Sequence, residues 1–377
     1  MRSLALLTAG VLLGACGGGG GTKAPAKPIG PAVDEKVAKK DAVGLVEEIY
    51  ETINRGKPDN LFSLLNDPLI VFGPRKADGM VTRSETLVAL GKLIDPKAKD
   101  NVQVRSSSLA VIASQGGHSA WAFDVVNVEG KQLAGLAVLT NDNDLWAVSA
   151  AGLAQTPSMR EVRAELKKVA VVPPGAMSPA KVDDRAQGAV DKFKKGLLEQ
   201  QVWGDDLGNS SDGLLIGPTA GDVTRGKKEI KRVWKKRVDA ETRAAISGEV
   251  AASTTPDGQL AWVTAPITRV EKDEDPLPLR AFAVFEKDGD NWKLIALQES
   301  LALDAAGSGE AFVKVLPPAL KPPEPPPEEP KKVEKDKDKK KAETKKKKKK
   351  KKKAADDDDD DDKPKKKKKK KLSDDDE

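Results

Sequence analysis

Four sequence landmarks recur in the same order in the two halves of the chain. An apolar strand, a Gly-Pro turn and then Val-Thr-Arg occur at residues 69–83 and again at 214–225. Two pairs of tryptophan-containing segments follow, 119–122 with 259–263 and 145–148 with 291–294. The spacing between partners stays between 141 and 146 residues, and such regularity indicates a duplicated domain.

Each copy begins with an amphipathic helix, since apolar residues recur at helical spacing at 43–53 and 186–197. A second helix is expected after each Gly-Pro turn, capped by Thr82 with Glu85 in the first copy and by Thr224 in the second. Alternating apolar runs then predict an antiparallel meander, which in the second copy comprises 248–254, 260–270, 279–286 and 292–298. In the first copy Asn141-Asp142-Asn143-Asp144 replaces the Asp-Gly turn, and a weaker strand is expected after it. Helices followed by strands predict an α+β fold.

The end of the second copy carries a family resemblance. Phe285-Glu286-Lys287-Asp288-Gly289 closes one strand, and 292–300 forms the next. Together with the order of elements, this resembles the SnoaL-like branch of the nuclear transport factor 2-like (NTF2-like) superfamily. The resemblance implies two tandem cone-shaped domains at 36–156 and 182–306, each with helices packed in a curved antiparallel sheet.

The N-terminus indicates export. Arg2 precedes an apolar run at 4–15, about a dozen residues long, whereas a membrane-spanning helix needs about 20. Leu13-Gly14-Ala15-Cys16 resembles the lipobox of bacterial lipoproteins, which implies removal of residues 1–15 and a lipid on Cys16, the only cysteine. The resemblance further implies a membrane-anchored protein of the cell envelope, with Gly17 favouring the outer membrane. An ordinary secretory peptide is the alternative.

Segments of biased composition lie between and beyond the two domains. Residues 16–35 form a Gly- and Pro-rich leash, with a reach of roughly 25 Å, and 157–181 form a linker. Residues 307–377 are expected to be a disordered tail, first Pro-rich and then rich in Lys and Asp. From residue 321 onward 25 Lys face 18 Asp and Glu, a surplus of +7, so the preceding part carries about −1 of the total +6. The tail is expected either to bind an anionic envelope polymer or to neutralise itself, and the folded part shows no charge footprint for nucleic acid.

Residue types that carry catalysis are scarce. The only histidine, His118, falls in a turn and is expected to be solvated, so no metal site and no cofactor are predicted. Tyr50 lies on the apolar stripe of the first helix and is expected in the core. The acidic pairs at 183–184 and 205–206 are expected on the surface. No catalytic residue is predicted.

The candidate pocket consists of Trp262, Arg280 and Trp292, on three successive strands of the second copy. By alternation Arg280 shares a face with Phe282 and Val284. If that face is the concave one, Arg280 would suit a carboxylate or small apolar ligand. If it is not, the tryptophans fill the sheet core and Arg280 lies at the rim.

The expected function is that of a non-catalytic binding or interaction module. One alternative is a small-molecule enzyme of isomerase, dehydratase or hydrolase type in the second cone, and another is an envelope tether that acts through its tail. A buried carboxylate near Arg280 would favour the enzyme, whereas an interior filled by Trp and Phe would favour the module. Each copy is expected to bury a separate core.

Overall fold

The computed structural model describes residues 30–72, 79–80, 82–93, 103–128, 131–156, 158, 160–161, 182–208, 211–301 and 318–321. The expected signal segment, Cys16, most of the linker and the Lys/Asp-rich tail lie outside these residues. Among the helices that are described, none is long and apolar enough to cross a membrane.

The first copy combines helices with a seven-stranded sheet. Its helical segments are α1 (Glu35–Asn54), η1 (Pro58–Leu64) and α2 (Arg83–Leu93). Its strands are β1 (Leu65–Phe72), β2 (Gly79–Met80), β3 (Val104–Ser106), β4 (Ala110–Ala113), β5 (Ser119–Val128), β6 (Lys131–Asp142) and β7 (Leu145–Gln155). The strand order is β2-β1-β7-β6-β5-β3, with β4 also paired to β5, and β1 runs parallel to β7.

The second copy repeats this arrangement. Its helical segments are η2 (Asp184–Ala186), α4 (Gln187–Leu198), α5 (Gln200–Asp206) and α6 (Lys227–Asp239). Its strands are β8 (Leu214–Ile216), β9 (Val223–Arg225), β10 (Arg243–Ile246), β11 (Ala251–Thr254), β12 (Leu260–Val270), β13 (Leu277–Asp288) and β14 (Asn291–Ser300). The order β9-β8-β14-β13-β12-β10, with β11 also on β12 and β8 parallel to β14, matches the first sheet strand for strand. The mixed α+β class is confirmed.

The two predicted helix caps have different outcomes. In the first copy the Thr82 backbone N–H donates to Glu85 Oε2 and the Glu85 N–H donates to Thr82 Oγ1, both at 3.1 Å, so the capping box is confirmed. The prediction for Thr224 is wrong. Thr224 pairs with Leu215 in the β8–β9 ladder, and α6 begins after Gly226, which has a positive φ of 79° and no capping side chain.

The turn between β6 and β7 has the positive φ angles typical of an Asp-Gly turn, although it contains no glycine. Asn143 and Asp144 both adopt the left-handed conformation, with φ of 54° and 63°, which Asn and Asp tolerate better than other side chains. The strand that follows, β7, has 11 residues, compared with 10 in β14. β7 is thus no shorter than its counterpart in the second copy.

Part of the segment expected to be disordered is folded. Residues 318–320 form a short 3-10 helix, η3 (Pro318–Leu320), that contacts β10, and Leu320 is only 5% exposed. Proline is compatible with the first turn of a helix, and Leu320 supplies an apolar anchor. The last described residues, 318–321, therefore lie beside β10, the strand that follows α6.

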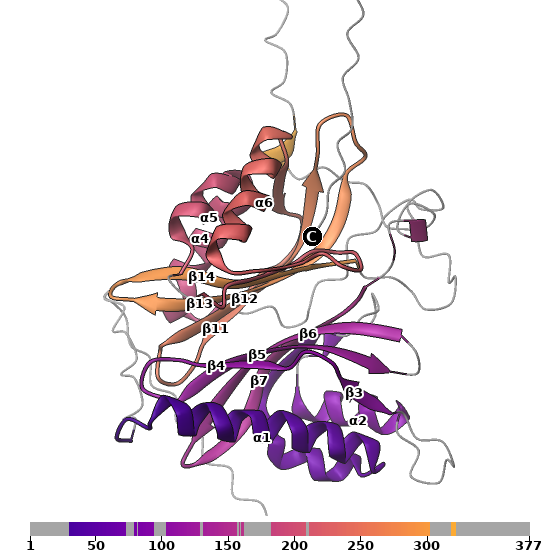
Figure 1. The fold of residues 1–377 in the computed structure, drawn as a ribbon, viewed down its shortest axis with the longest axis vertical. Helices are drawn as coiled ribbons and strands as arrows, with labels where there is room; N and C mark the ends of the chain where they lie inside the picture. The colour runs from indigo at the N-terminus through magenta and orange to yellow at the C-terminus, as the bar shows by residue number, and fades with distance from the viewer. Residues whose placement is uncertain are drawn as a thin grey trace, which may run out of the picture. The chain divides into compact units, whose positions relative to one another are not determined.

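Each sheet is covered by its own helices on one face. In Figure 1, α4, α5 and α6 lie together on one face of the second sheet, and α1 and α2 lie on a face of the first. Two hydrophobic clusters correspond to these helix-covered faces, one for each copy. The helix α4 buries the apolar stripe that the helical spacing predicts, including Phe193 and Leu197. On α1 the predicted stripe faces the cluster, but only Val46 of it is fully buried, and its other members are partly buried: Val43, Ile49, Tyr50 and Ile53.

A third hydrophobic cluster is built by both copies together. It contains Trp121 and Phe123 of β5 with Trp262 of β12 and Phe282 of β13. At its edge Gln298 Nε2 donates to the Ala134 carbonyl over 3.0 Å. The expectation of fully separate cores is therefore corrected: the helix-covered faces are separate, but the opposite faces of the two sheets share one cluster.

Candidate functional site

The three residues of the predicted pocket lie on successive strands but on two different faces. Trp262 pairs directly with Val284, and strand alternation puts Arg280 on the same face as Val284. Trp262 and Val284 belong to the cluster shared with the first copy, whereas Trp292 belongs to the cluster under the helices. Arg280, 7% exposed, is therefore not a cation inside the second cone. The structure does not bring the three side chains around one space.

Large aromatic side chains occupy the helix-covered interior of the second copy. The rings of Trp203 and Trp234 have centroids 5.4 Å apart, and those of Phe193 and Trp203 are 6.4 Å apart. The Trp203 indole lies directly on α4, where a Cβ added to Gly196 would fall 1.6 Å from its Nε1. This interior is packed with Trp and Phe side chains, the arrangement that was expected to favour a non-catalytic binding or interaction module over an enzyme.

The second copy also buries one carboxylate on this side, that of Glu299, which is fully buried. Arg237 donates to Oε1 over 3.1 Å and to Oε2 over 2.8 Å, and Arg269 donates to Oε2 over 2.8 Å. Burial alone would raise the pKa of Glu299, but the two arginines outweigh it and hold the pKa below its ordinary value. Because both oxygens are already bonded, this carboxylate is a structural tie.

The first copy also buries a carboxylate, that of Asp124, but only one of its oxygens has a hydrogen-bond partner among the described residues. Asp124 on β5 is 3% exposed, and its neighbours Ala120 and Ala122 in strand alternation belong to the helix-covered cluster. Oδ1 accepts a hydrogen bond from the Ser108 N–H at 2.9 Å. Oδ2 is buried and has no hydrogen-bond partner among the described residues. Asp124 was missed in the sequence, although an acid inside the run Ala-Trp-Ala-Phe-Asp-Val-Val was visible.

Tyr50 on α1 faces this carboxylate. Its side chain is partly buried against the helix-covered cluster, which confirms the expected core position. Burial, then the negative charge of Asp124, then hydrogen bonding to it raise the pKa of Tyr50 above its ordinary value. The contact does not reach regular hydrogen-bond geometry at Oδ2, so this oxygen keeps capacity for another donor. Asp124 and Tyr50 form the candidate site.

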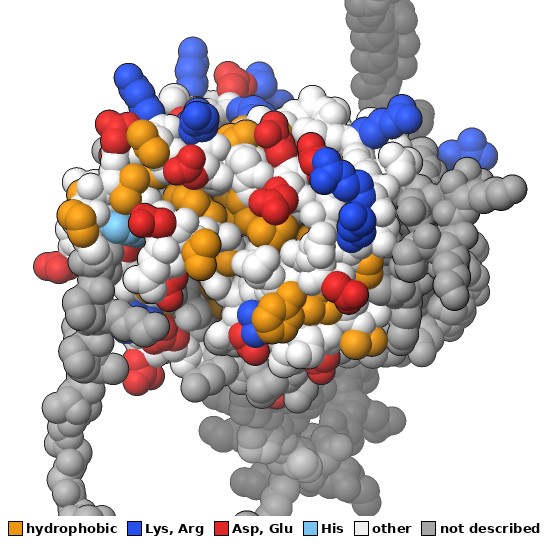
Figure 2. Space-filling view, turned by 90° about the horizontal axis from the view of Figure 1, so that it is seen from below, with side chains coloured by type: hydrophobic (Ala, Val, Ile, Leu, Met, Phe, Trp, Pro, Cys, Tyr) orange, Lys and Arg blue, Asp and Glu red, His pale blue; other side chains and the backbone are white. Residues whose placement is uncertain are grey.

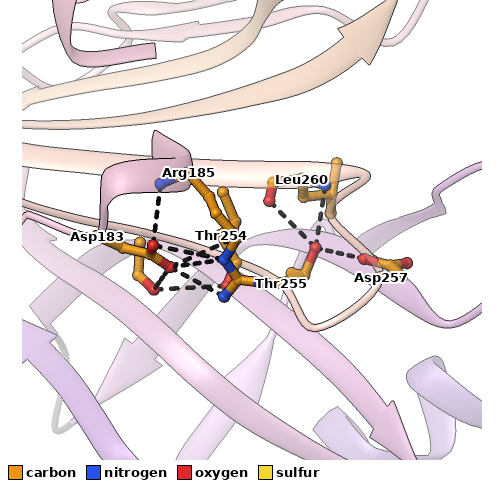
Figure 3. Close-up of polar contacts among 7 residues, drawn as sticks. Asp183, Arg185, Thr254, Thr255, Asp257 and Leu260 are labelled. Atoms are coloured by element: carbon orange, nitrogen blue, oxygen red, sulfur yellow. Dashed lines mark hydrogen bonds and ion pairs between the residues drawn. The ribbon is translucent and has the colours of Figure 1, made fainter. Parts of the chain in front are cut away.

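The other titratable residues singled out in the sequence have local roles. Asp183 accepts from the Arg185 N–H at 3.0 Å and pairs with the Arg185 side chain at 2.9 Å, while the hydroxyls of Ser253 and Thr254 donate to it (Figure 3). Asp206 pairs with the Lys192 ammonium at 2.7 Å. Their neighbours Asp184 and Asp205 are exposed. The Asp183 contacts hold the start of α4 against β11, and the Asp206 contact holds the end of α5 against α4. Neither pair of acidic residues forms an acid–base pair.

His118 is half-buried, and its Nε2 is buried without a hydrogen-bond partner among the described residues. The expectation of a fully solvated ring is therefore corrected, because the turn packs its ring against the fold. Within the described part of the chain, no group of three or more His, Cys, Asp or Glu is arranged to hold a metal ion.

Comparison with known proteins identifies the second copy. Residues 201–304, from α5 past the end of β14, match the model of a SnoaL-like domain. The chain thus contains one SnoaL-like, NTF2-like domain at these residues. No curated protein matches the sequence.

Solved structures with NTF2-like folds are similar to parts of this chain. An NTF2-like protein of unknown function from Pseudomonas putida has 12% identity and a TM-score of 0.31, over 33% of this chain and 92% of its own. An NTF2-like protein from Cytophaga hutchinsonii has 15% identity and a TM-score of 0.27, over 31% of this chain and 96% of its own. One from Shewanella baltica, of unknown function, has 11% identity and a TM-score of 0.27, over 33% and 99%.

Proposed function

We propose that the protein is a lipid-anchored binding module of the cell envelope, whose first domain holds a small ligand between α1 and the sheet. The observation that supports this most is the buried Oδ2 of Asp124, which has no hydrogen-bond partner among the described residues. Leaving a buried acceptor unsatisfied costs about 1–3 kcal/mol, and more for a charged group. A ligand that donates to Oδ2 would offset this cost.

The surroundings of Asp124 define the class of ligand. Ala122, Ala137 and Ala151 supply small apolar side chains on the helix-covered face of the same sheet, so an apolar body is favoured. The carboxylate requires a hydroxyl, amine or amide N–H donor, whereas a carboxylate ligand would be repelled. The proposed site thus lies in the first domain, whereas the sequence predicted a site at Arg280 in the second. The ligand is expected to carry a hydrogen-bond donor, whereas Arg280 would have bound a carboxylate.

A catalytic role in the second cone has less support. Its interior is filled by Trp203, Trp234 and Phe193, and the carboxylate of Glu299 is neutralised by two arginines. The second domain is better suited to support the first through the shared cluster. Turnover at Asp124, with the carboxylate as a general base, is the competing function, and conversion of the bound molecule would reveal it.

The ligand is tested by untargeted mass spectrometry of small molecules that co-purify with the mature protein. The native chain should carry a molecule with a donor group that Asp124→Asn loses, because the amide replaces part of the acceptor capacity with donors. Asp142→Asn makes the same chemical change at an exposed position and should retain the molecule. Loss from both variants, or recovery from both, would contradict a site at Asp124.

The anchor is tested separately. Leu13-Gly14-Ala15-Cys16 supports lipidation of Cys16, so Cys16→Ser should release the protein from membranes and abolish labelling by a fatty-acid analogue. A variant that remains in the membrane fraction, or a native protein without label, would refute the anchor and leave the ligand proposal standing.

A further inference from the structure

One face of helix α6 carries almost only positive charge. Ile230 and Trp234 point inward, each 1% exposed. On the opposite side of the helix the exposed basic residues are Lys228, Lys231, Arg232, Lys235 and Lys236. We call these five residues the basic face. The near-neutral net charge of the folded part conceals this local concentration of positive charge.

The sequence of α6 is poorly suited to stability on its own. Lys231 and Lys235 are four residues apart, as are Lys228 and Arg232, and like charges at this spacing destabilise a helix. Lys227 and Lys228 also lie in the first turn, where the helix dipole disfavours cations. Two acids of α6 offset part of this charge: Glu229 pairs with Arg232 at 2.8 Å, and the exposed Asp239 ends the helix three and four residues after Lys236 and Lys235. Repulsion retained in this way indicates a function for the charge.

The helix that carries the basic face is held to the rest of the domain near both of its ends. On the inner side of α6, Arg237 binds the fully buried Glu299 through two hydrogen bonds. At the other end Lys227 Nζ donates to the Leu207 carbonyl over 3.2 Å. In Figure 1 the helix lies beside α5 in the helical layer of the second domain. The charges are thus presented without an ordering cost in the backbone.

The described residues of the first copy form no comparable face. Figure 2 looks onto the side of the first copy, where acidic, basic and hydrophobic side chains are interspersed. On α1 the exposed Lys39 and Lys40 are followed by the exposed Asp41, and the exposed Glu35 lies four residues before Lys39. These lysines provide a matched control for α6.

We propose that the basic face of α6 docks on an anionic phospholipid surface, the membrane that holds the lipid anchor. The choice of partner rests on the proposed anchor, since a leash with a reach of roughly 25 Å keeps the domains near the headgroups. Lys and Arg side chains are attracted to anionic headgroups, and a lipid chain with a basic patch gives two-signal binding. The acidic block at 356–362 is a weaker partner, because lysine blocks flank it on both sides.

The test uses the full chain with Cys16→Ser, so that lipid insertion does not contribute. Its binding to phosphatidylcholine vesicles with and without phosphatidylglycerol is compared for two double variants, Lys231→Glu with Lys235→Glu and Lys39→Glu with Lys40→Glu. Both variants change the net charge equally. The comparison is repeated with residues 324–377 deleted, which removes no described residue and eliminates the competing tail lysines.

The α6 variant should bind phosphatidylglycerol vesicles about tenfold more weakly or worse, and the α1 variant should stay within about twofold of the parent. The α6 variant should also melt at the same temperature or higher, because like-charge repulsion is relieved. Equal losses in the two variants, binding that ignores phosphatidylglycerol, or tighter α6-dependent binding to duplex DNA than to vesicles would each overturn the proposal. Failure here leaves the anchor and the ligand site untouched.

Discussion

Arg237 on α6 binds both carboxylate oxygens of Glu299 on β14, with Nη1 3.1 Å from Oε1 and Nη2 2.8 Å from Oε2. Arg269 on β12 shares the same carboxylate at 2.8 Å. One buried acid thus ties a helix to two strands. Replacing it by Glu299→Gln removes the acidic partner of the largely buried Arg237 and leaves Arg269 with only the exposed Glu271, 3.5 Å from its Nε.

Glu299→Gln should lower the free energy of unfolding by about 3–5 kcal/mol, as expected when one partner of a buried ion pair is removed. Urea denaturation of the mature protein measures this. Glu271→Gln is the control, since Glu271 is 47% exposed and lies 3.5 Å from Arg269 Nε; it should cost less than about 1 kcal/mol. Equal costs for the two variants would show that burial of Glu299 adds nothing.

The same ion cluster makes stability depend on acid. The folded pKa of Glu299 lies below its ordinary value of 4.5, so its contribution is present above that value and is lost as the pH falls through the folded pKa. Unfolding free energy should therefore decline below about pH 4.5. The decline should be smaller in Glu299→Gln. Identical pH profiles for native and variant protein would contradict this assignment.

The shared cluster should couple the two domains. Trp262 is 5% exposed, and Trp262→Ala should cost about 3–5 kcal/mol. Both copies should unfold in one thermal transition, and a fragment of residues 182–306 should melt at a lower temperature, because Phe282 and Val284 would be uncovered. Leu145→Ala, at a side chain 73% exposed, is the control. A fragment as stable as the whole chain would mean that the cluster contributes nothing.

Asp124→Asn should leave the ligand-free protein equally stable or more stable, since it removes a buried charge whose second oxygen has no partner among the described residues. Differential scanning calorimetry on ligand-stripped protein measures this. A drop of more than about 2 kcal/mol would indicate a structural role instead.

Long elements with clear periodicity were predictable from the sequence. The bounds predicted for β12 coincide with the observed strand, the predicted stripe of α4 is buried, and that of α1 packs partly buried against its cluster. Short elements such as α5 and β10 were missed because a few residues carry no readable period. The short helix η3 was missed because it depends on a tertiary contact, the packing of its segment against β10, which the local sequence does not show.

The site was harder to predict because both faces of each sheet are covered. Alternation showed that Arg280 shares a face with Phe282, but only tertiary packing decides which face lies under the helices. Around Asp124 both faces of β5 are apolar, so the strand has no polar alternation and the buried acid gave no indication of its side. The repeated order of helices and strands could be predicted from the sequence, whereas the shared cluster depends on how the two copies pack.

The most direct test of the account is the titration of Tyr50, the only tyrosine in the chain, followed through tyrosinate absorbance. The native protein should show a pKa above the ordinary 10.0, because burial and the Asp124 carboxylate oppose ionisation. In Asp124→Asn the pKa should fall but stay above 10.0, since burial remains. An ordinary pKa in the native protein, or the same raised value in Asp124→Asn, would contradict a charged carboxylate beside Tyr50 in the first domain.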